Sequence, residues 1–137
     1  MFTKDVIFFQ KAVVKHPTDE LFLILKRNAL SSMPNMWEFP GGGVDFGEGH
    51  VEAIVREIQE ETGLVVQNPQ VLDVFSRFAS ESQTYRLCIG YQCEATSAQI
   101  QLSDEHTDYK WISTDDFATI DTWDFLKALV NKAYQAE

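Results

Sequence analysis

One helical segment, residues 51–62, constrains this chain more than any other feature. Apolar side chains recur at helical spacing over residues 51–58 and predict a face buried against a core. On another side Glu57, Glu60 and Glu61 become neighbours, and each like-charge pair costs ~0.2–0.5 kcal/mol. Gly63 follows as a residue suited to a left-handed helix cap. Stability alone does not explain three carboxylates crowded near the negative end of a helix.

Two interpretations of these carboxylates stay open on the helix alone. They form either a solvated charged face or a set of hard oxygen ligands of the kind that Mg²⁺ or Mn²⁺ requires. The glycines before the helix favour the second interpretation. Residues 41–43 are all glycine, and Gly47 and Gly49 flank Glu48, so this loop can approach a ligand closely.

The net charge of −10 is unevenly distributed along the chain. The sequence has 21 acidic and 11 basic residues, and residues 42–64 alone hold six acids and one base, net −5. An acid excess repels phosphate backbones and anionic lipid, so we expect no nucleic-acid polymer and no membrane as a partner. A small phosphate compound could still bind through a divalent cation.

The remaining pattern predicts an α+β fold, a mixed sheet with helices packed on its faces. Residues 6–14 and 21–25 predict two strands that form a hairpin around a turn at residues 16–19. Further strands are expected at residues 37–39, 71–78, 84–94 and 109–112, and a terminal helix at residues 122–136.

The composition is typical of one globular domain, residues 1–137. No apolar run is long enough to cross a bilayer and the first residues lack a signal-peptide layout, so we expect a cytoplasmic protein. Cys88 and Cys93 lie an odd number of residues apart on a predicted strand and face opposite sides, which indicates two buried reduced thiols. The three histidines make no zinc spacing.

The glycine loop and the acidic helix together resemble the Nudix box. The box pattern is glycine, five residues, glutamate, seven residues, Arg-Glu, a hydrophobic residue, any residue, Glu-Glu, any residue, glycine and a hydrophobic residue. This chain matches every specified position over residues 42–64, with Gly42, Glu48, Arg56, Glu57, Ile58, Glu60, Glu61, Gly63 and Leu64. The segment at residues 37–42 is similar to MutT-type members of the Nudix hydrolase superfamily, and so is the stretch at residues 105–111.

The resemblance implies a Nudix fold, an α/β/α sandwich around a central mixed sheet. It also implies hydrolysis of a nucleoside diphosphate linked to a variable group, with Mg²⁺ or Mn²⁺ as the cofactor. By resemblance, Glu60 and Glu61 are metal ligands, and Glu57 is either a third ligand or the general base. The carbonyl of Gly41 is a further expected ligand, and Arg56 is expected to orient Glu57.

Residues outside this core set carry further expectations from the resemblance. Glu48 either buttresses the loop and the helix or takes part in catalysis. Glu105 is expected as an additional ligand or as the base, with Asp104 and Asp108 as nearby alternatives, whereas His106 is expected to be structural. Arg27 stands where MutT-type members place a phosphate-binding arginine, with Lys26 as the alternative contact. Gly42 belongs to the substrate-binding loop.

The substrate is the point where the sequence leaves alternatives open. We expect a (deoxy)nucleoside triphosphate, cleaved to a monophosphate and pyrophosphate. The alternatives are hydrolysis of another nucleoside diphosphate such as a nucleotide sugar, or a Nudix module that senses nucleotides without turnover. The chain is expected to act as a monomer or a homodimer.

Overall fold

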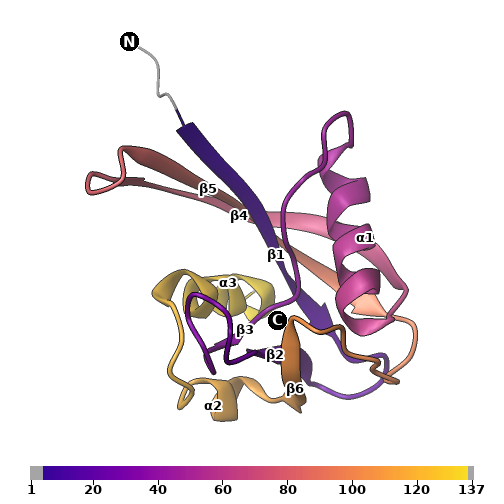
Figure 1. Ribbon diagram of the computed structural model, residues 1–137. Coiled ribbons are helices and arrows are strands. Elements are labelled where there is room, and N and C mark those ends of the chain that lie inside the picture. Colours follow the sequence, from indigo (N-terminus) through magenta and orange to yellow (C-terminus); the bar gives the residue numbers. More distant parts are fainter. Residues whose placement is uncertain (1–4, 136–137) are drawn as a thin grey trace.

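A mixed sheet with helices on both faces forms the centre of the molecule (Figure 1). The structure is a computed structural model, and it describes residues 5–135. The elements follow in the order β1 (Asp5–Lys15), β2 (Phe22–Arg27), β3 (Trp37–Glu38), α1 (His50–Thr62), β4 (Val66–Ala79), β5 (Thr84–Ala95), β6 (His106–Ile112), α2 (Thr114–Phe117) and α3 (Asp124–Tyr134). The strand order is β3-β2-β1-β5-β4, with β6 paired to β2.

Strand β1 pairs in parallel with β5 along its whole length, from Asp5 opposite Thr84 to Lys15 opposite Glu94. Consecutive residues of β1 therefore alternate between two apolar layers, because strand side chains point to opposite faces. Ala12 and Val14 join the core under α1, whereas Val13 joins the core under α2 and α3. The two cores make the sandwich, and the predicted α+β fold, a mixed sheet with helices on its faces, is confirmed.

The predicted hairpin of the first two strands is present but short. β1 and β2 are antiparallel, with one register pair, Lys15 opposite Phe22. Nearer its N-terminus, the same edge of β1 pairs instead with the glycine segment, residues 40–43. The Gln10 N–H donates to the Gly42 carbonyl, and the Ala12 N–H donates to the Pro40 carbonyl. The loop before the acidic helix thus occupies the edge that a longer hairpin would use.

Helix α1 begins one residue earlier than predicted and ends as predicted. Gly63 caps it in the left-handed conformation, with φ of 75° and an N–H bonded to the Gln59 carbonyl. The apolar face of α1 packs on the sheet through Ala53, Ile54 and Ile58. The acidic side chains are therefore presented beside β1 and the glycine segment.

Strand β4 differs from the prediction, because it begins at Val66 rather than at residue 71. Asn68 adopts a positive φ of 54°, and the register shifts between Gln67 and Gln70. Pro69 fits this irregular stretch because β4 is an edge strand of the described sheet, where a missing N–H removes no ladder bond. Asn68 and Pro69 therefore form an irregularity within β4 instead of a turn before the strand.

The rest of the pattern is largely as expected. Cys88 and Cys93 are free and buried. Helix α2 was not predicted; Ser113 caps it by accepting a hydrogen bond from the Asp116 N–H. The predicted last helix runs over Asp124–Tyr134, and its predicted end at Ala136 lies outside the described residues. Over residues 5–135 there is no helix with the length and apolar character needed to cross a membrane.

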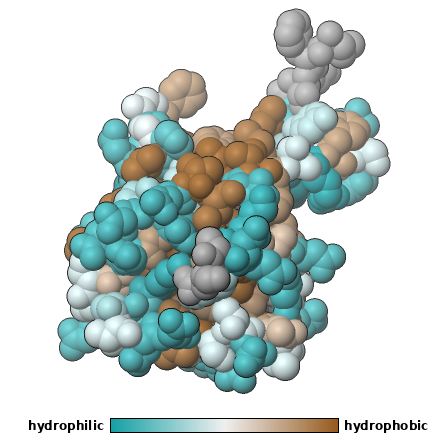
Figure 2. Space-filling model, turned by 180° about the vertical axis from the view of Figure 1, so that it is seen from behind, coloured by the Kyte–Doolittle hydropathy of each residue, from teal (hydrophilic) through white to brown (hydrophobic). Residues whose placement is uncertain are grey.

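The β4–β5 hairpin extends past the helices, together with the first half of β1 (Figure 1). Apolar side chains are exposed on these strands, among them Val6, Val74, Phe78 and Tyr85. Figure 2, the view from behind, shows apolar side chains gathered near the upper centre of that face. The helices therefore cover only part of the sheet.

Candidate active site

The glycine segment brings the backbone against the acidic side of α1. The Gly41 N–H donates to the Glu61 carboxylate at 2.9 Å, within the buried part of the molecule. A Cβ atom at Gly42 would lie 2.6 Å from the Glu57 carboxyl group, so that carboxyl group would have to move. A Cβ atom at Gly41, where φ is 149°, would lie 1.9 Å from the Gln10 carbonyl oxygen, so Gly41 is required for the close approach of the loop to β1.

Arg56 ties the loop to the helix. Its Nε and Nη2 donate to the two oxygens of Glu48 at 2.7 and 3.0 Å, and Nη2 also reaches the Gly43 carbonyl at 3.3 Å. Its Nη1 donates to Glu57 and Glu60 at 3.1 Å. The hydrogen bond from Arg56 holds the pKa of Glu48 below its ordinary value. Arg56 lies in contact with Glu57, and Glu48 has the geometry of a buttress.

Glu57 and Glu60 differ in burial. The Glu60 side chain is 58% exposed, and both of its oxygens accept from Arg56. The Glu57 side chain is mostly buried. Burial raises the pKa of Glu57, Arg56 opposes that rise, and the charges of Glu60 and Glu105 add to it. Glu57 is thus a carboxylate in a crowded acidic environment, which suits a proton acceptor or a metal ligand.

Glu61 and Glu105 meet at the centre of the site. Burial raises the pKa of Glu61 to about 8; the Lys11 ammonium and the Gly41 N–H oppose the rise, and Glu105 adds to it. One oxygen each of Glu61 and Glu105 and one ring nitrogen of His106 lie within 4.8 Å of one another. Two carboxylates this close need a shared proton or a cation, so the donor set fits a hard divalent ion.

A buried network around Glu38 forms the next layer. Glu38 accepts from Lys11 Nζ at 2.9 Å and from Arg27 Nη1 at 3.1 Å, and His106 Nε2 lies 2.7 Å from its other oxygen. Burial alone would raise the pKa of Glu38, but Lys11, the His106 hydrogen bond and Arg27 together lower it to about 2. Glu38 therefore stays ionised.

The network around Glu38 was not predicted from the sequence. Lys11, a charged residue within an otherwise apolar strand, was the available signal for it. The predicted phosphate contact Arg27 is held here, since its Nε and Nη2 also donate to Ser31 and Ser32 at 3.3 Å.

A cavity of about 320 Å³ opens beside this network. It is lined by Arg27, Asn28, Leu30, Ser31, Glu38, Glu105 and His106. Predicted residues from β2 and from the loop before β6 therefore share one hollow. The cationic group of Arg27 and the carboxylate of Glu105 stand in its wall, as a site for a phosphate compound and a metal ion would require.

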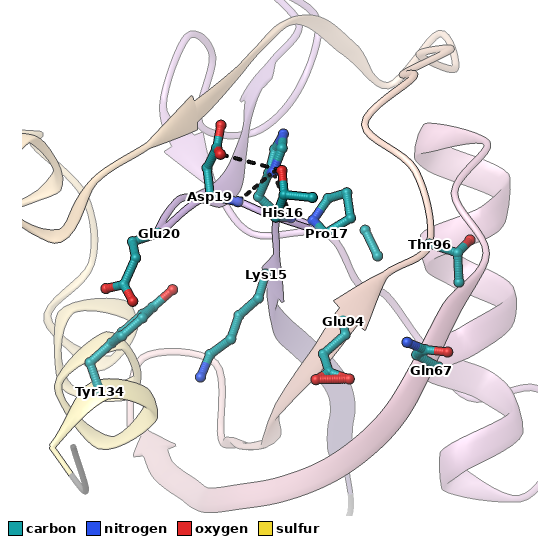
Figure 3. Close-up of a pocket in the computed structure, with 11 residues that line it drawn as sticks. Lys15, His16, Pro17, Asp19, Glu20, Gln67, Glu94, Thr96 and Tyr134 are labelled. Atoms are coloured by element: carbon teal, nitrogen blue, oxygen red, sulfur yellow. Dashed lines mark hydrogen bonds between the residues drawn. The ribbon is translucent and has the colours of Figure 1, made fainter.

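A second cavity, of about 570 Å³, contains none of the predicted site residues (Figure 3). It lies between the turn after β1, the start of β4 and the end of α3. Lys15 stands there between Tyr134 and Glu94; its Nζ donates to the Ala133 carbonyl and covers the Tyr134 ring at 4.6 Å. Glu94 accepts from Asn68 at 2.7 Å. The larger hollow is therefore not the candidate active site.

The comparisons with known proteins decide the family. The family model for the NUDIX domain matches residues 10–132 of this chain. The chain belongs to the Nudix hydrolase family. The predicted resemblance to MutT-like Nudix proteins is confirmed.

Two curated relatives illustrate the range of this Nudix protein's similarities. The 8-oxo-dGTP diphosphatase of Escherichia coli (strain K12) is 38% identical over 69 residues, which are 50% of each chain. The chain thus spans half the length of that relative. The asymmetrical bis(5'-nucleosyl)-tetraphosphatase of Rattus norvegicus is 31% identical over 103 residues, 72% of this chain and 70% of that protein.

Solved structures share the Nudix fold over nearly the whole chain. A MutT Nudix hydrolase from Burkholderia pseudomallei aligns with a TM-score of 0.79 at 22% identity, covering 94% of this chain and 98% of that one. The Nudix domain of Shewanella oneidensis NrtR, complexed with ADP ribose, aligns with a TM-score of 0.82 at 18% identity, covering 97% and 89%.

Proposed function

We propose that this Nudix protein hydrolyses the pyrophosphate linkage of a nucleoside diphosphate derivative with Mg²⁺ or Mn²⁺. The substrate that we favour is a (deoxy)nucleoside triphosphate, cleaved to a monophosphate and pyrophosphate. The observation that carries the proposal is the buried Glu61 carboxylate facing Glu105 beside a cavity that also holds Arg27. The curated relatives, a diphosphatase and a tetraphosphatase, act on compounds of this chemical class.

The metal is held in this proposal by carboxylate oxygens of Glu57, Glu60 and Glu61, by the Gly41 carbonyl and by Glu105. A divalent ion bound there would neutralise phosphate charge and lower the pKa of a bound water. Arg27, which lines the same cavity as Glu105, would bind a phosphate group, because a guanidinium matches two phosphate oxygens. The glycine segment lets the backbone lie beside the reacting groups.

Hydrolysis also requires a general base that accepts a proton from the attacking water. Water adds to a phosphorus atom of the anhydride, the bridging P–O bond breaks, and a carboxylate accepts the proton that the water loses. Glu57 and Glu105 are both candidates for that base. Arg56 orients Glu57 through the 3.1 Å hydrogen bond from Nη1, and Glu48 fixes Arg56 from the loop.

Two alternatives would give different products. Hydrolysis of a nucleotide sugar would give a monophosphate and a phosphorylated sugar, and a sensing module would bind nucleotides without turnover. The crowded carboxylates disfavour the sensing module, because a module that only binds has no need to keep like charges together. A single domain over residues 1–137, a cytoplasmic location and a monomeric or homodimeric state stay predictions from the sequence.

A substrate panel separates these alternatives. Nucleoside triphosphates, oxidised and unmodified, and nucleotide sugars are incubated with the protein and Mg²⁺ or Mn²⁺, and the products are identified by chromatography. The proposal expects a monophosphate and pyrophosphate, and no reaction when the metal is chelated. Turnover confined to nucleotide sugars would replace the proposed substrate, and binding without any turnover would favour the sensing module.

A further inference from the structure

One ring nitrogen of His106 has no hydrogen-bond partner within residues 5–135. Its side chain is only 2% exposed at the start of β6. Nε2 lies 2.7 Å from a Glu38 oxygen, whereas Nδ1 is buried and has no hydrogen-bond partner among the described residues. Buried polar atoms are nearly always paired, so an unpaired nitrogen in a core needs a reason. A purely structural histidine would satisfy both nitrogens.

The partner of Nε2 fixes which ring nitrogen donates to Glu38. Glu38 is held ionised by Lys11 and Arg27, and an ionised carboxylate can only accept hydrogen bonds. Nε2 therefore carries the proton in the Nε2–H···Glu38 bond, and in the neutral ring Nδ1 carries a free lone pair. Metal-binding histidines have this arrangement, with one nitrogen donating to a carboxylate and the other facing the ion.

The carboxylates that would share such an ion are next to the ring. A His106 ring nitrogen lies within 4.8 Å of oxygens of both Glu61 and Glu105, and His106 and Glu105 line the same cavity of about 320 Å³. Since Nε2 is engaged by Glu38, Nδ1 is the nitrogen left to bind a cation between Glu61 and Glu105. Lys11, a cation whose charge acts on Glu61, is already engaged by Glu38 and by the Phe39 carbonyl at 3.3 Å.

We propose that His106 Nδ1 is a ligand of a divalent transition-metal ion that Glu61 and Glu105 also bind. The proposal rests on the proposed function for the metal site itself, and it adds a nitrogen donor to the set of oxygen ligands. Mg²⁺ is a hard cation that takes oxygen ligands, whereas transition metals accept nitrogen as well as oxygen, with affinity rising from Mn²⁺ to Co²⁺. We therefore expect the nitrogen donor to strengthen the binding of Mn²⁺ and Co²⁺ more than that of Mg²⁺, with Glu38 as the positioning residue that orients the ring. His106 is then not the purely structural residue that the sequence suggested.

Pulsed electron paramagnetic resonance of bound Mn²⁺ tests the nitrogen ligand without any turnover. The variant H16Q/H50Q keeps His106 as its only histidine, and it is prepared with ¹⁵N-labelled histidine, freed of metal and loaded with one equivalent of Mn²⁺. Hyperfine modulation from ¹⁵N is expected in this protein, and its absence while Mn²⁺ is bound would overturn the proposal; H16Q/H50Q/H106Q, which contains no labelled residue, gives only the background signal. Since the first protein retains His106, the test holds even if the H106Q substitution prevents folding.

Calorimetric titration gives the second readout. H106Q is expected to weaken Mn²⁺ binding at least ~10-fold, the scale seen when the support of a metal ligand is removed, and to change Mg²⁺ binding by far less. If Mn²⁺ binds to the wild type without histidine coupling, the nitrogen ligand is wrong and the proposed function stands. If neither metal binds to the wild type, the proposed function fails as well.

Discussion

The backbone N–H of Gly41 donates a hydrogen bond to the carboxylate of Glu61 at 2.9 Å. The bond joins the segment beside β1 to the last turn of α1, and it holds one oxygen of a buried acid. In the proposed site the same carboxylate also binds a metal ion, which would relieve the repulsion between Glu61 and Glu105.

The substitution Gly42→Ala tests the close approach of the loop to the helix. The new Cβ would lie 2.6 Å from the Glu57 carboxyl group and would displace it. We expect kcat to fall on the order of 100-fold, because small misplacements of reacting groups carry costs of that size. Gly43→Ala is the matched control, since no atom lies within 4 Å of a Cβ there. Equal rates in the two variants would contradict the role given to Gly42.

The substitution Arg27→Gln tests the proposed phosphate contact against the alternative Lys26. Arg27 lines the cavity and is held by Glu38, so its guanidinium is already oriented. We expect Arg27→Gln to raise KM by roughly 10-fold, the value of one charge-assisted hydrogen bond. Lys26→Gln should leave KM near the wild-type value. The opposite result, a raised KM in the Lys26 variant alone, would assign the contact to Lys26.

Thermal melting of Glu61→Gln separates folding from metal binding. The amide still accepts the hydrogen bond from Gly41, and above pH 8, where the metal-free Glu61 carboxyl group is ionised, it removes a charge that faces Glu105. The metal-free variant should therefore be no less stable than the wild type. Saturating Mn²⁺ at a hundred times its Kd stabilises a protein by about 2.7 kcal/mol, and this gain should be absent in the variant. Glu52→Gln, an exposed acid of the same helix, should keep the gain. If Glu61→Gln also keeps the stability gained from Mn²⁺, Glu61 is excluded as a ligand.

The lowered pKa of Glu38 predicts how the stability of the fold depends on pH. Its pKa falls from an ordinary 4.5 to about 2 on folding, so the unfolded chain binds more protons between those values. The contribution of Glu38 is present above pH 4.5 and is lost as the pH falls toward 2; a shift of this size corresponds to on the order of 3 kcal/mol.

Acid unfolding of Glu38→Gln measures that contribution. The free-energy gap between wild type and variant should be widest above pH 4.5 and should narrow toward pH 2. Glu81→Gln, at an exposed position in the turn between β4 and β5, serves as the control and should show a small gap that does not change with pH. A gap for Glu38→Gln that stays constant over this range would exclude the lowered pKa.

The acidic helix and its loop could be predicted from sequence because their signals are local. The spacing of Glu57, Glu60 and Glu61 is fixed by the helix, and Gly63 marks its end. The parallel pairing of β1 with β5 could not be predicted, since Asp5 and Thr84 are far apart in the chain and parallel pairing has no turn signal. The Glu38 network was missed for the same reason, because it joins four elements or loops that meet only in the fold.

The turnover numbers of Glu57→Gln and Glu61→Gln, beside Glu52→Gln, test the central claim most directly. All three substitutions remove one charge from the same helix, and only the first two lie in the proposed site. We predict that kcat on the best substrate of the panel falls at least ~100-fold in Glu57→Gln and Glu61→Gln, the scale of a lost catalytic or metal-binding carboxylate, and stays near wild type in Glu52→Gln. Near-wild-type rates in both site variants would contradict the account.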